Sequence, residues 1–430
     1  MKRPNILIIL SDQLRRNGLG CYGNKDINTP NIDALARTGV LFDNAYSTCP
    51  VCVPFRFTFM TGEYAHTRAV ANIHYRMSPA ERTLADEFNE IGYDTMYCGK
   101  WHLNGLPHET GAIANLAQIK PSHQGRWKKW LGFELANDPF NTFYFEDDNP
   151  EPRRIDGYQT DGLFDLTMDY IKSQQSDDPP FVSVLSVEPP HFPLEVPDTY
   201  LEKWKNKELE LPPNLLYRDK YPCPGDETYQ AEDDIEALID LRKRYYAMIE
   251  NLDWNVGRMI DVLKETGKLT DTIIVFMSDH GQMDGAHAKR NQRKTHPYEE
   301  STGIPLIVNT NGALETGTKR IKEPVCTEDI FPTLLGLAGL VPKHEKPGLD
   351  LTPLVTGETT ELPRNGILQE IMHDFRPSQP YHKQSWRAFR SRKYKYTVLG
   401  DDLSGGKPWQ FFDLQNDPFE MDNLIDDLVY

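Results

Sequence analysis

The run Asn5-Ile6-Leu7-Ile8-Ile9-Leu10, which leads into Ser11-Asp12-Gln13, decides the fold that we expect for this chain. An apolar run without polar alternation is typical of a strand buried on both faces, as in parallel sheets covered by helices. Similar runs occur later, at residues 94–97, 181–187, 272–277 and 305–308. We therefore predict that all five segments are parallel strands of one buried sheet.

Helical patterns lie between these strands. The segment 30–38 has proline at its first helical position and Thr29 as its expected N-cap, and it stops at Gly39. Further helices are predicted at residues 83–91, 160–173 and 231–265. Because strands alternate with helices, we expect an open α/β sheet with helices on both faces.

The end of the chain predicts a different structure. After a stretch rich in glycine and proline at residues 342–363, shorter segments at 366–371, 386–389, 394–398 and 410–414 are typical of a small antiparallel sheet. We expect a large domain at residues 1–345 and a C-terminal subdomain at residues 346–430. Residues 104–158 and 188–230 are expected to be long loops over the carboxyl ends of the strands, where polar ligands gather in such sheets.

Composition excludes some partners. The chain has 430 residues, with 47 basic and 64 acidic side chains and a net charge of -17, which argues against nucleic acid or an anionic membrane as a partner. Salt screens such repulsion beyond about 10 Å, so a local group of cations can still bind an anionic substrate. No apolar stretch reaches the roughly 18 residues that a membrane-spanning helix needs.

The first residues have the outline of a secretion signal, because Lys2 and Arg3 precede an apolar run. The run is shorter than a signal core, however, and no small-residue cleavage site follows it. A cytoplasmic location is therefore expected, and a periplasmic or secreted one if a signal has been removed. The six cysteines are spaced too irregularly to predict a disulfide framework.

One cysteine lies in a distinctive segment, Cys52-Val53-Pro54-Phe55-Arg56, with Thr61-Gly62 following. Cys49 and Cys52 also form a C-x-x-C pair, which is found in redox centres and zinc sites. A second C-x-x-C is missing from the sequence, and the surroundings do not resemble thioredoxin, which disfavours both alternatives.

The segment at Cys52 resembles the maturation signature of type I sulfatases, C-x-P-x-R-x-x-x-x-T-G. Other segments resemble that family in the same order: Ser11-Asp12-Gln13, Gly99-Lys100-Trp101-His102, Glu188-Pro189-Pro190-His191-Phe192-Pro193, Ser278-Asp279-His280-Gly281, and Lys294 before Tyr298-Glu299-Glu300-Ser301. The resemblance implies an alkaline phosphatase-like fold, with a large mixed, mostly parallel sheet flanked by helices. It also implies hydrolysis of a sulfate monoester by a formylglycine (3-oxoalanine) that a maturation enzyme makes from Cys52.

A divalent metal is expected at the same edge of the sheet. Asp12 and Asp279 follow two strands and supply hard oxygen ligands, which suit Ca²⁺ or another hard ion. His280 can add a nitrogen and Gln13 an amide oxygen. Ser11 stands where the family often has a first aspartate, which leaves the identity of the metal open.

The resemblance also nominates catalytic side chains. Arg56 and Lys100 are expected to hold the sulfuryl group, and His102 is expected to carry a proton during turnover. His191 and Lys294 are candidates for binding the ester oxygens and protonating the departing alcohol. Lys294 also belongs to a basic cluster, residues 289–294, that could simply be a solvated face.

Substrate recognition is the least determined part. Side chains in the long loops and after a C-terminal strand could contact a sugar or a second anionic group: His123, Arg126, Trp127, Arg153, Arg154, His373 and Arg376. Aromatic residues in these loops favour a glycan or aryl sulfate. Two alternatives remain open: a phosphonate or phosphate ester hydrolase of the same superfamily, and a glycan-binding protein without turnover if Cys52 is unmodified. Lys100 and His102 favour the sulfatase.

Overall fold

The computed structural model describes residues 3–105, 115–223, 234–289, 293–317, 319–372, 381, 384–401 and 405–427. Within these ranges ten strands form one twisted sheet in the order β11-β2-β10-β9-β1-β8-β4-β5-β6-β7. In that order the strands span Arg320–Ile321, Val40–Phe42, Leu306–Asn309, Thr272–Ser278, Asn5–Ser11, Phe181–Val187, Asp94–Lys100, Lys129–Phe133, Phe143–Glu146 and Arg153–Arg154. The strands β9, β1, β8, β4 and β5 are parallel, so the predicted mixed, mostly parallel sheet is confirmed.

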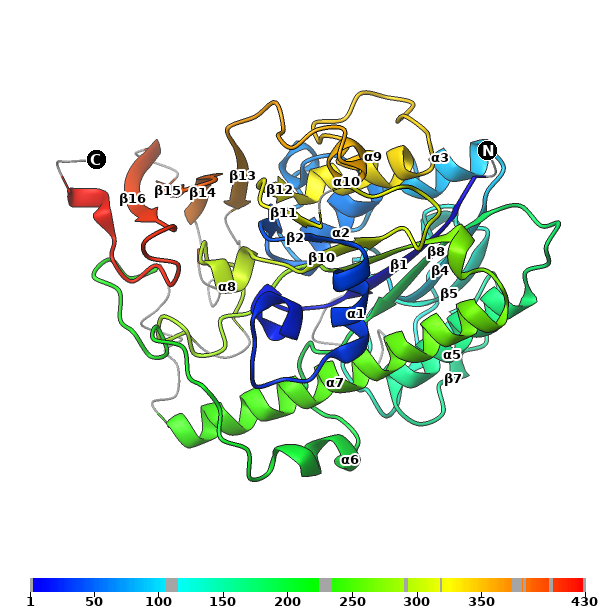
Figure 1. The fold of residues 1–430 in the computed structure, drawn as a ribbon, viewed down its shortest axis with the longest axis horizontal. Helices are drawn as coiled ribbons and strands as arrows, with labels where there is room; N and C mark the ends of the chain where they lie inside the picture. Colours follow the sequence, from blue (N-terminus) through cyan, green and yellow to red (C-terminus); the bar gives the residue numbers. More distant parts are fainter. Residues whose placement is uncertain are drawn as a thin grey trace.

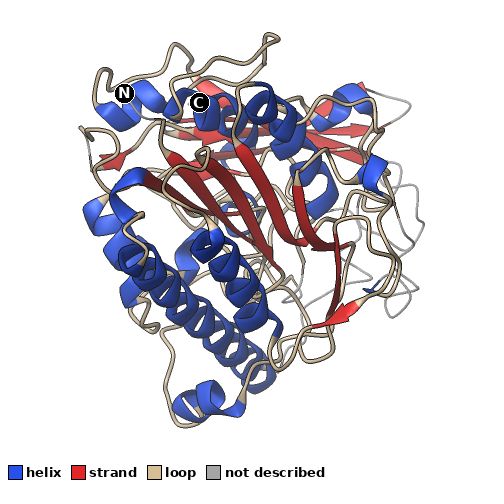
Figure 2. Cartoon of the chain, turned by 90° about the vertical axis from the view of Figure 1, so that its right-hand side faces the viewer, coloured by secondary structure: helices blue, strands red, loops and turns tan. Residues whose placement is uncertain are grey.

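Helices cover both faces of the sheet. Neighbouring side chains of each strand point to opposite sides, and because both sets are apolar, each face must be buried. From β1, Ile6, Ile8 and Leu10 pack against one set of helices, and Leu7 and Ile9 pack against the other. The first set is α2 (Cys52–Thr61), α3 (Leu84–Glu90) and α9 (Thr327–Leu337), and the second is α1 (Pro30–Thr38), α5 (Gln159–Ser173) and α7 (Ile235–Glu265). Figures 1 and 2 show these layers around the central strands.

The structure corrects one predicted strand direction and one predicted loop. β10 is antiparallel to β9, although the apolar run at residues 305–308 predicted a parallel strand. Between them the described chain forms one short helix, α8 (Glu299–Thr302), and no long crossover helix, so it returns beside the strand that it left. The expected loop at residues 104–158 contains β5, β6 and β7. The apolar runs of β5 and β6 are short, and β7 consists of two exposed arginines, so the sequence pattern was too weak to predict these strands.

The cap expected at α1 also differs. Thr29 makes no side-chain cap bond, and its hydroxyl lies 3.0 Å from Asp33 Oδ1. Instead, Asp253 of α7 accepts hydrogen bonds from the backbone N–H groups of Asn31 (3.0 Å) and Ile32 (2.8 Å). The first amides of α1 are therefore satisfied by a distant helix.

The predicted antiparallel sheet near the C-terminus is confirmed. Its strands lie in the order β13-β14-β15-β16 and span Gly366–Ile371, Gln384–Ser391, Tyr394–Asp401 and Gly405–Asp413. The remaining short elements are α6 (Asp198–Leu201), α10 (Thr352–Thr356) and the pair of β3 (Ala45–Tyr46) with β12 (Val325–Cys326). None of the helices in the described ranges combines the length and hydropathy that a membrane crossing requires.

Buried charges join this small sheet to the large domain. Lys395 of β15 is fully buried and forms ion pairs with Glu420 and with Glu299 of α8, the latter at 3.6 Å. Beside them, Asn214 donates to Glu300 (2.7 Å) and His287 Nδ1 lies 2.9 Å from Asp219 Oδ1. The buried charges of this interface are thus paired with charged or polar side chains of the protein.

We expect Lys395→Met to destabilise the C-terminal sheet. Removing one partner of a buried ion pair leaves the other charge unpaired, which costs about 3–5 kcal/mol. Hydrogen exchange of the β13–β16 amides would measure the loss. Lys407→Met, at an exposed lysine on the neighbouring strand β16, is the control. Equal protection in the two variants would contradict the role given to Lys395.

Candidate active site

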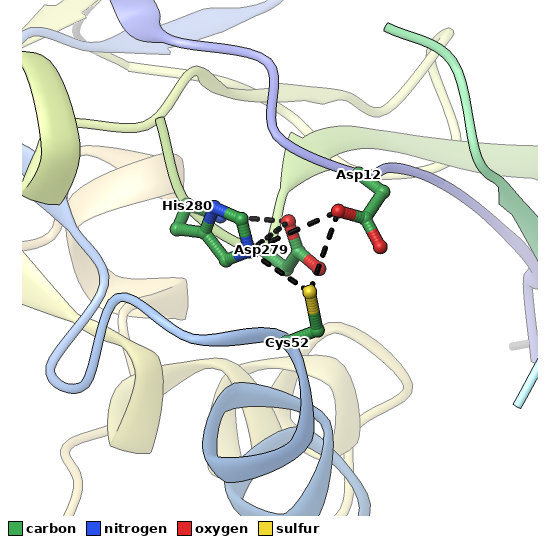
Figure 3. A group of neighbouring side chains, drawn as sticks. All are labelled: Asp12, Cys52, Asp279 and His280. Carbon is green, nitrogen blue, oxygen red and sulfur yellow. Dashed lines mark hydrogen bonds and ion pairs between the residues drawn. The ribbon is translucent and has the colours of Figure 1, made fainter. Parts of the chain in front are cut away.

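Polar residues from several strands meet at the carboxyl edge of the sheet, as the sequence predicted. Asp12 follows β1, Asp279 and His280 follow β9, Lys100 ends β4 and Glu188 follows β8. Cys52, the first residue of α2, lies among them (Figure 3). Figure 3 shows the side chains of Asp12, Cys52, Asp279 and His280 pointing toward one another.

The Cys52 sulfur is surrounded by three of the predicted side chains. Its Sγ atom lies 3.1 Å from Lys294 Nζ, 3.2 Å from His280 Nε2 and 3.6 Å from Asp12 Oδ1. Cys52, His280 and Asp12 are buried, and Lys294 is partly buried. Lys294 therefore contacts the residues around Cys52 and is not a fully solvated surface lysine.

Two further cations, Arg56 and Lys100, pair with Asp12 beside the sulfur. Arg56, one helical turn after Cys52, donates to Asp12 Oδ2 (3.1 Å) and Asp279 Oδ2 (3.4 Å). Lys100 Nζ lies 2.8 Å from Asp12 Oδ2 and 3.7 Å from Glu188 Oε1. Both cations are almost fully buried, so their attraction for an anion is weakly screened by water.

The two aspartates have different electrostatic surroundings. Burial alone would raise the pKa of Asp12, but the charges of Lys100, Arg56 and Lys294 outweigh it and hold this pKa well below its usual range. Burial and the charge of Asp12 raise the pKa of Asp279 to about 7, against the effects of Arg56 and Lys294. The cations of the protein thus offset only part of the negative charge of Asp279. A bound metal ion would supply the missing positive charge.

The remaining donors fit a divalent ion. The ligand atoms of Asp12, Cys52, Asp279 and His280 all lie within 4.8 Å of one another. His280 Nδ1 donates to the carbonyl of Gly281 (2.9 Å), which leaves the Nε2 lone pair facing the site, and burial together with Lys294 lowers the pKa of His280 well below its usual value. Two carboxylates with an amide oxygen from Gln13 favour a hard ion.

Ser11 takes no part in this donor set. Its hydroxyl donates to the carbonyl of Pro189 at 2.8 Å. Gln13 has a left-handed backbone (φ 66°), and its N–H donates to Asp279 Oδ1 at 2.9 Å. Its side-chain oxygen accepts a hydrogen bond from Lys294, also at 2.9 Å. The structure therefore brings Asp12 and Gln13 to the site, while the Ser11 hydroxyl bonds elsewhere.

The unmodified thiol of Cys52 is poorly suited to nucleophilic attack. Burial and Asp12 raise its pKa to about 11, so about one thiol in 10⁴ would be ionised at pH 7. Cys49 lies in a separate apolar cluster with Val51 and Tyr298, and both cysteines are free thiols. The separation of the two cysteines gives no support to a redox pair or to a zinc site that Cys49 and Cys52 share.

The two other predicted histidines lie at the same edge. His102 is buried two residues beyond β4, with a left-handed backbone (φ 55°) and its N–H bonded to the carbonyl of Glu134 at 3.0 Å. His191 follows β8, and its Nδ1 donates to the carbonyl of Phe192 at 2.6 Å. Burial, Lys100 and Lys294 lower the pKa of His191 well below its usual value, so the side chain is neutral at pH 7.

None of the described substrate-binding candidates has a recorded contact with the residues around Cys52, and two of them form ion pairs with other parts of the chain. Arg126 donates to the carbonyl of Pro79 (2.7 Å) and pairs with Asp86, and Arg153 pairs with Glu146 (2.6 Å). His123 is partly exposed at the end of a short helical turn. Trp127 is buried in the core and Arg154 is exposed on β7. His373 and Arg376 lie outside the described residues.

Sequence reasoning gave no role to three buried residues around the site. Glu188 pairs with Lys100, and its carboxylate accepts hydrogen bonds from the N–H groups of Ala136 (3.0 Å) and Asn137 (3.1 Å). Glu134 accepts a hydrogen bond from the N–H of Asn104 (2.9 Å), and Gln282 accepts one from Gln13. Glu188 and Glu134 each directly follow a strand, the signal that identified Asp279.

Comparisons with known proteins agree with this site. Residues 4–340 match the family described as sulfatase, and residues 287–430 match N-sulphoglucosamine sulphohydrolase, C-terminal. An ulvan-active sulfatase of Formosa agariphila is 31% identical over 98% of this chain and 77% of its own length. An N-acetylglucosamine-6-O-sulfatase of Bacteroides thetaiotaomicron is 24% identical over 100% of this chain and 84% of its own. The crystal structure of yidJ from Bacteroides fragilis, described as a candidate sulfatase, has a TM-score of 0.84 at 27% identity, over 99% of this chain and 92% of that one.

Proposed function

Because this chain belongs to the sulfatase family and is therefore a sulfuric ester hydrolase, we propose that it removes sulfate from a sulfated glycan with a nucleophile derived from Cys52. The observation that carries this proposal is the position of the Cys52 sulfur, 3.1 Å from Lys294 and 3.6 Å from Asp12, beside the buried cations Arg56 and Lys100. Such a site places a reactive atom where an anionic ester would be held.

The chemistry of the nucleophile comes from a modification. Formylglycine at position 52 supplies, as its hydrate, a hydroxyl nucleophile that the buried thiol cannot replace at neutral pH. The side chains of Pro54 and Arg56 are the elements that a maturation enzyme would recognise. Arg56 and Lys100 then bind the oxygens of the sulfuryl group and offset the negative charge that develops on them.

A divalent ion, Ca²⁺ in our proposal, would be held by Asp12, Gln13, Asp279 and His280. When bound, such an ion polarises a sulfate oxygen and helps to activate a hydroxyl for attack. Lys294 donates to an ester oxygen, because its ammonium group already lies 3.1 Å from the sulfur at position 52. Lys294 also protonates the departing alcohol, and neutral His191 accepts a hydrogen bond from it through Nε2. His102 carries the proton that must move when the enzyme is regenerated.

The charge of the site supports a singly charged ester. The cations Arg56, Lys100 and Lys294 face three carboxylates, those of Asp12, Asp279 and Glu188. The side chains alone are therefore close to neutral, and the excess charge would come from the metal. A sulfate monoester carries one negative charge, whereas a phosphate monoester carries nearly two at neutral pH. By adding one negative charge beside Lys100, Glu188 lowers the net positive charge of the site, and this change is in the direction that favours a singly charged ester.

Two relatives support a glycan as the substrate. One is named as active on ulvan and the other as acting on an N-acetylglucosamine sulfate. A glycan-binding protein without turnover is the outcome expected only if residue 52 stays a cysteine.

We expect kcat/KM to be at least about tenfold higher for a sulfate ester than for the phosphate or phosphonate ester of the same alcohol. Keeping the leaving group constant isolates the effect of the anion, and tenfold corresponds to about 1.4 kcal/mol of differential transition-state binding. Steady-state kinetics on p-nitrophenyl sulfate, phosphate and phenylphosphonate would measure it. A preference for the phosphonate would replace this proposal by a phosphonate ester hydrolase.

A further inference from the structure

The hydrogen bonds of Gln13 have a direction that one neighbour determines. The Lys294 ammonium group can only donate, so the atom of Gln13 that lies 2.9 Å from it must be the carbonyl oxygen, Oε1. The NH₂ group of Gln13 therefore points the other way. There it donates to Gln282 Oε1 at 2.8 Å.

This direction matters because of where Gln13 lies. It directly follows Asp12, and its N–H donates to Asp279 Oδ1 at 2.9 Å. Lys294, which bonds the Gln13 oxygen, also contacts the Cys52 sulfur at 3.1 Å. An amide that turned over would point two N–H hydrogens toward Lys294 and toward any bound cation, which would repel both.

Gln282 is buried, and its backbone is held on both sides. It is 1% exposed and lies two residues after His280. The backbone is fixed on both sides, because Gly281 N–H donates to the carbonyl of Ser301 (2.8 Å) and Met283 N–H donates to that of Arg293 (2.7 Å). The backbone thus holds the Gln282 side-chain oxygen within reach of the Gln13 amide, from which it accepts a hydrogen bond at 2.8 Å.

We propose that Gln282 is a positioning residue of the metal site, which keeps the Gln13 carboxamide turned with its oxygen toward the ion. This inference rests on the proposed function, because it takes Asp12, Gln13, Asp279 and His280 as the ligands. Partners that orient a ligand typically change metal affinity about 10- to 100-fold when they are removed. We expect a loss of this size when Gln282 can no longer accept a hydrogen bond.

Two substitutions separate this role from simple packing. Gln282→Met removes the acceptor at similar volume, and it should weaken Ca²⁺ binding by about tenfold or more. Gln282→Glu keeps an acceptor at the same reach, so it should bind Ca²⁺ at least as tightly as the unsubstituted protein. A residue that only fills space predicts the opposite order, because a buried methionine is tolerated better than a buried carboxylate.

The measurement is titration calorimetry of the full chain with Ca²⁺ alone, supported by the Ca²⁺-dependent rise in Tm. In a Gln13→Leu background, Gln282→Met should cause little further loss, since the amide that it orients is gone. Unchanged affinity in Gln282→Met, or equal weakening in both variants, would overturn the inference while leaving the proposed function intact. If the unsubstituted protein binds no divalent ion, the proposed metal site and this inference both fail.

Discussion

Replacing Cys52 with alanine is expected to lower kcat/KM for a sulfate ester by about 10⁴- to 10⁶-fold, because removal of a covalent nucleophile leaves only binding and charge stabilisation. The fold should persist, since the substitution is small and α2 is buried along its whole length. Peptide mass spectrometry of the unsubstituted protein from a competent host should find formylglycine at position 52. Kinetics on one sulfate ester and the mass of this peptide are the two measurements.

Cys49→Ala is the matched control for this experiment. Cys49 is a buried free thiol three residues earlier, but it lies in an apolar cluster and not in the group around position 52. Its replacement should leave kcat/KM within about twofold, in the range of substitutions that miss the reacting groups. Full activity in protein whose residue 52 is entirely unmodified cysteine would refute the proposed nucleophile.

The second large effect is expected for Asp279→Asn, which should lower kcat/KM by about 10³-fold. Asparagine has the same shape and can still accept the hydrogen bonds from the N–H groups of Gln13 and His280. It lacks the negative charge that a hard cation requires, and a metal contributes several kcal/mol to transition-state stabilisation, at about 1.4 kcal/mol for each tenfold.

Thermal stability gives an independent measure of the same site. An ion that binds only the folded protein raises Tm, so a chelator should lower the Tm of the unsubstituted protein and leave that of Asp279→Asn unchanged. Asp253→Asn is the control, because this buried acid caps α1 and does not belong to the group of possible metal ligands around Cys52. It should lose stability but keep its response to the chelator. Chelation without effect on either Tm or turnover would show that the metal assignment is wrong.

Much of the fold could be read from contiguous residues. The segments 5–10, 181–187 and 272–277 were predicted as buried parallel strands and lie in β1, β8 and β9. A local pattern suffices there, because a strand buried on both faces is apolar along most of its length. The order of the sulfatase-like segments likewise indicated the family, and the family match over residues 4–340 confirms it.

The candidate site was predictable to the same extent. Acids that directly follow apolar strands meet at one edge of a parallel sheet, so Asp12 and Asp279 could be placed together from their positions alone. Cys52 and Arg56 needed the resemblance, because α2 is buried along its whole length and lacks the amphipathic pattern of a surface helix.

Other features depended on pairs of residues far apart in the sequence. The antiparallel direction of β10, the cap of α1 by Asp253, the pairing of Lys100 with Glu188 and the contact of Gln13 with Gln282 are all of this kind. Periodicity and motif spacing report which face of an element is buried, and they contain no information on which distant side chain will meet it. By itself the sequence therefore determined the central parallel strands and the family, and it nominated the candidate residues of the site. Only the tertiary structure decided how these groups are charged, oriented and held, because those properties arise from contacts that form when the strands assemble.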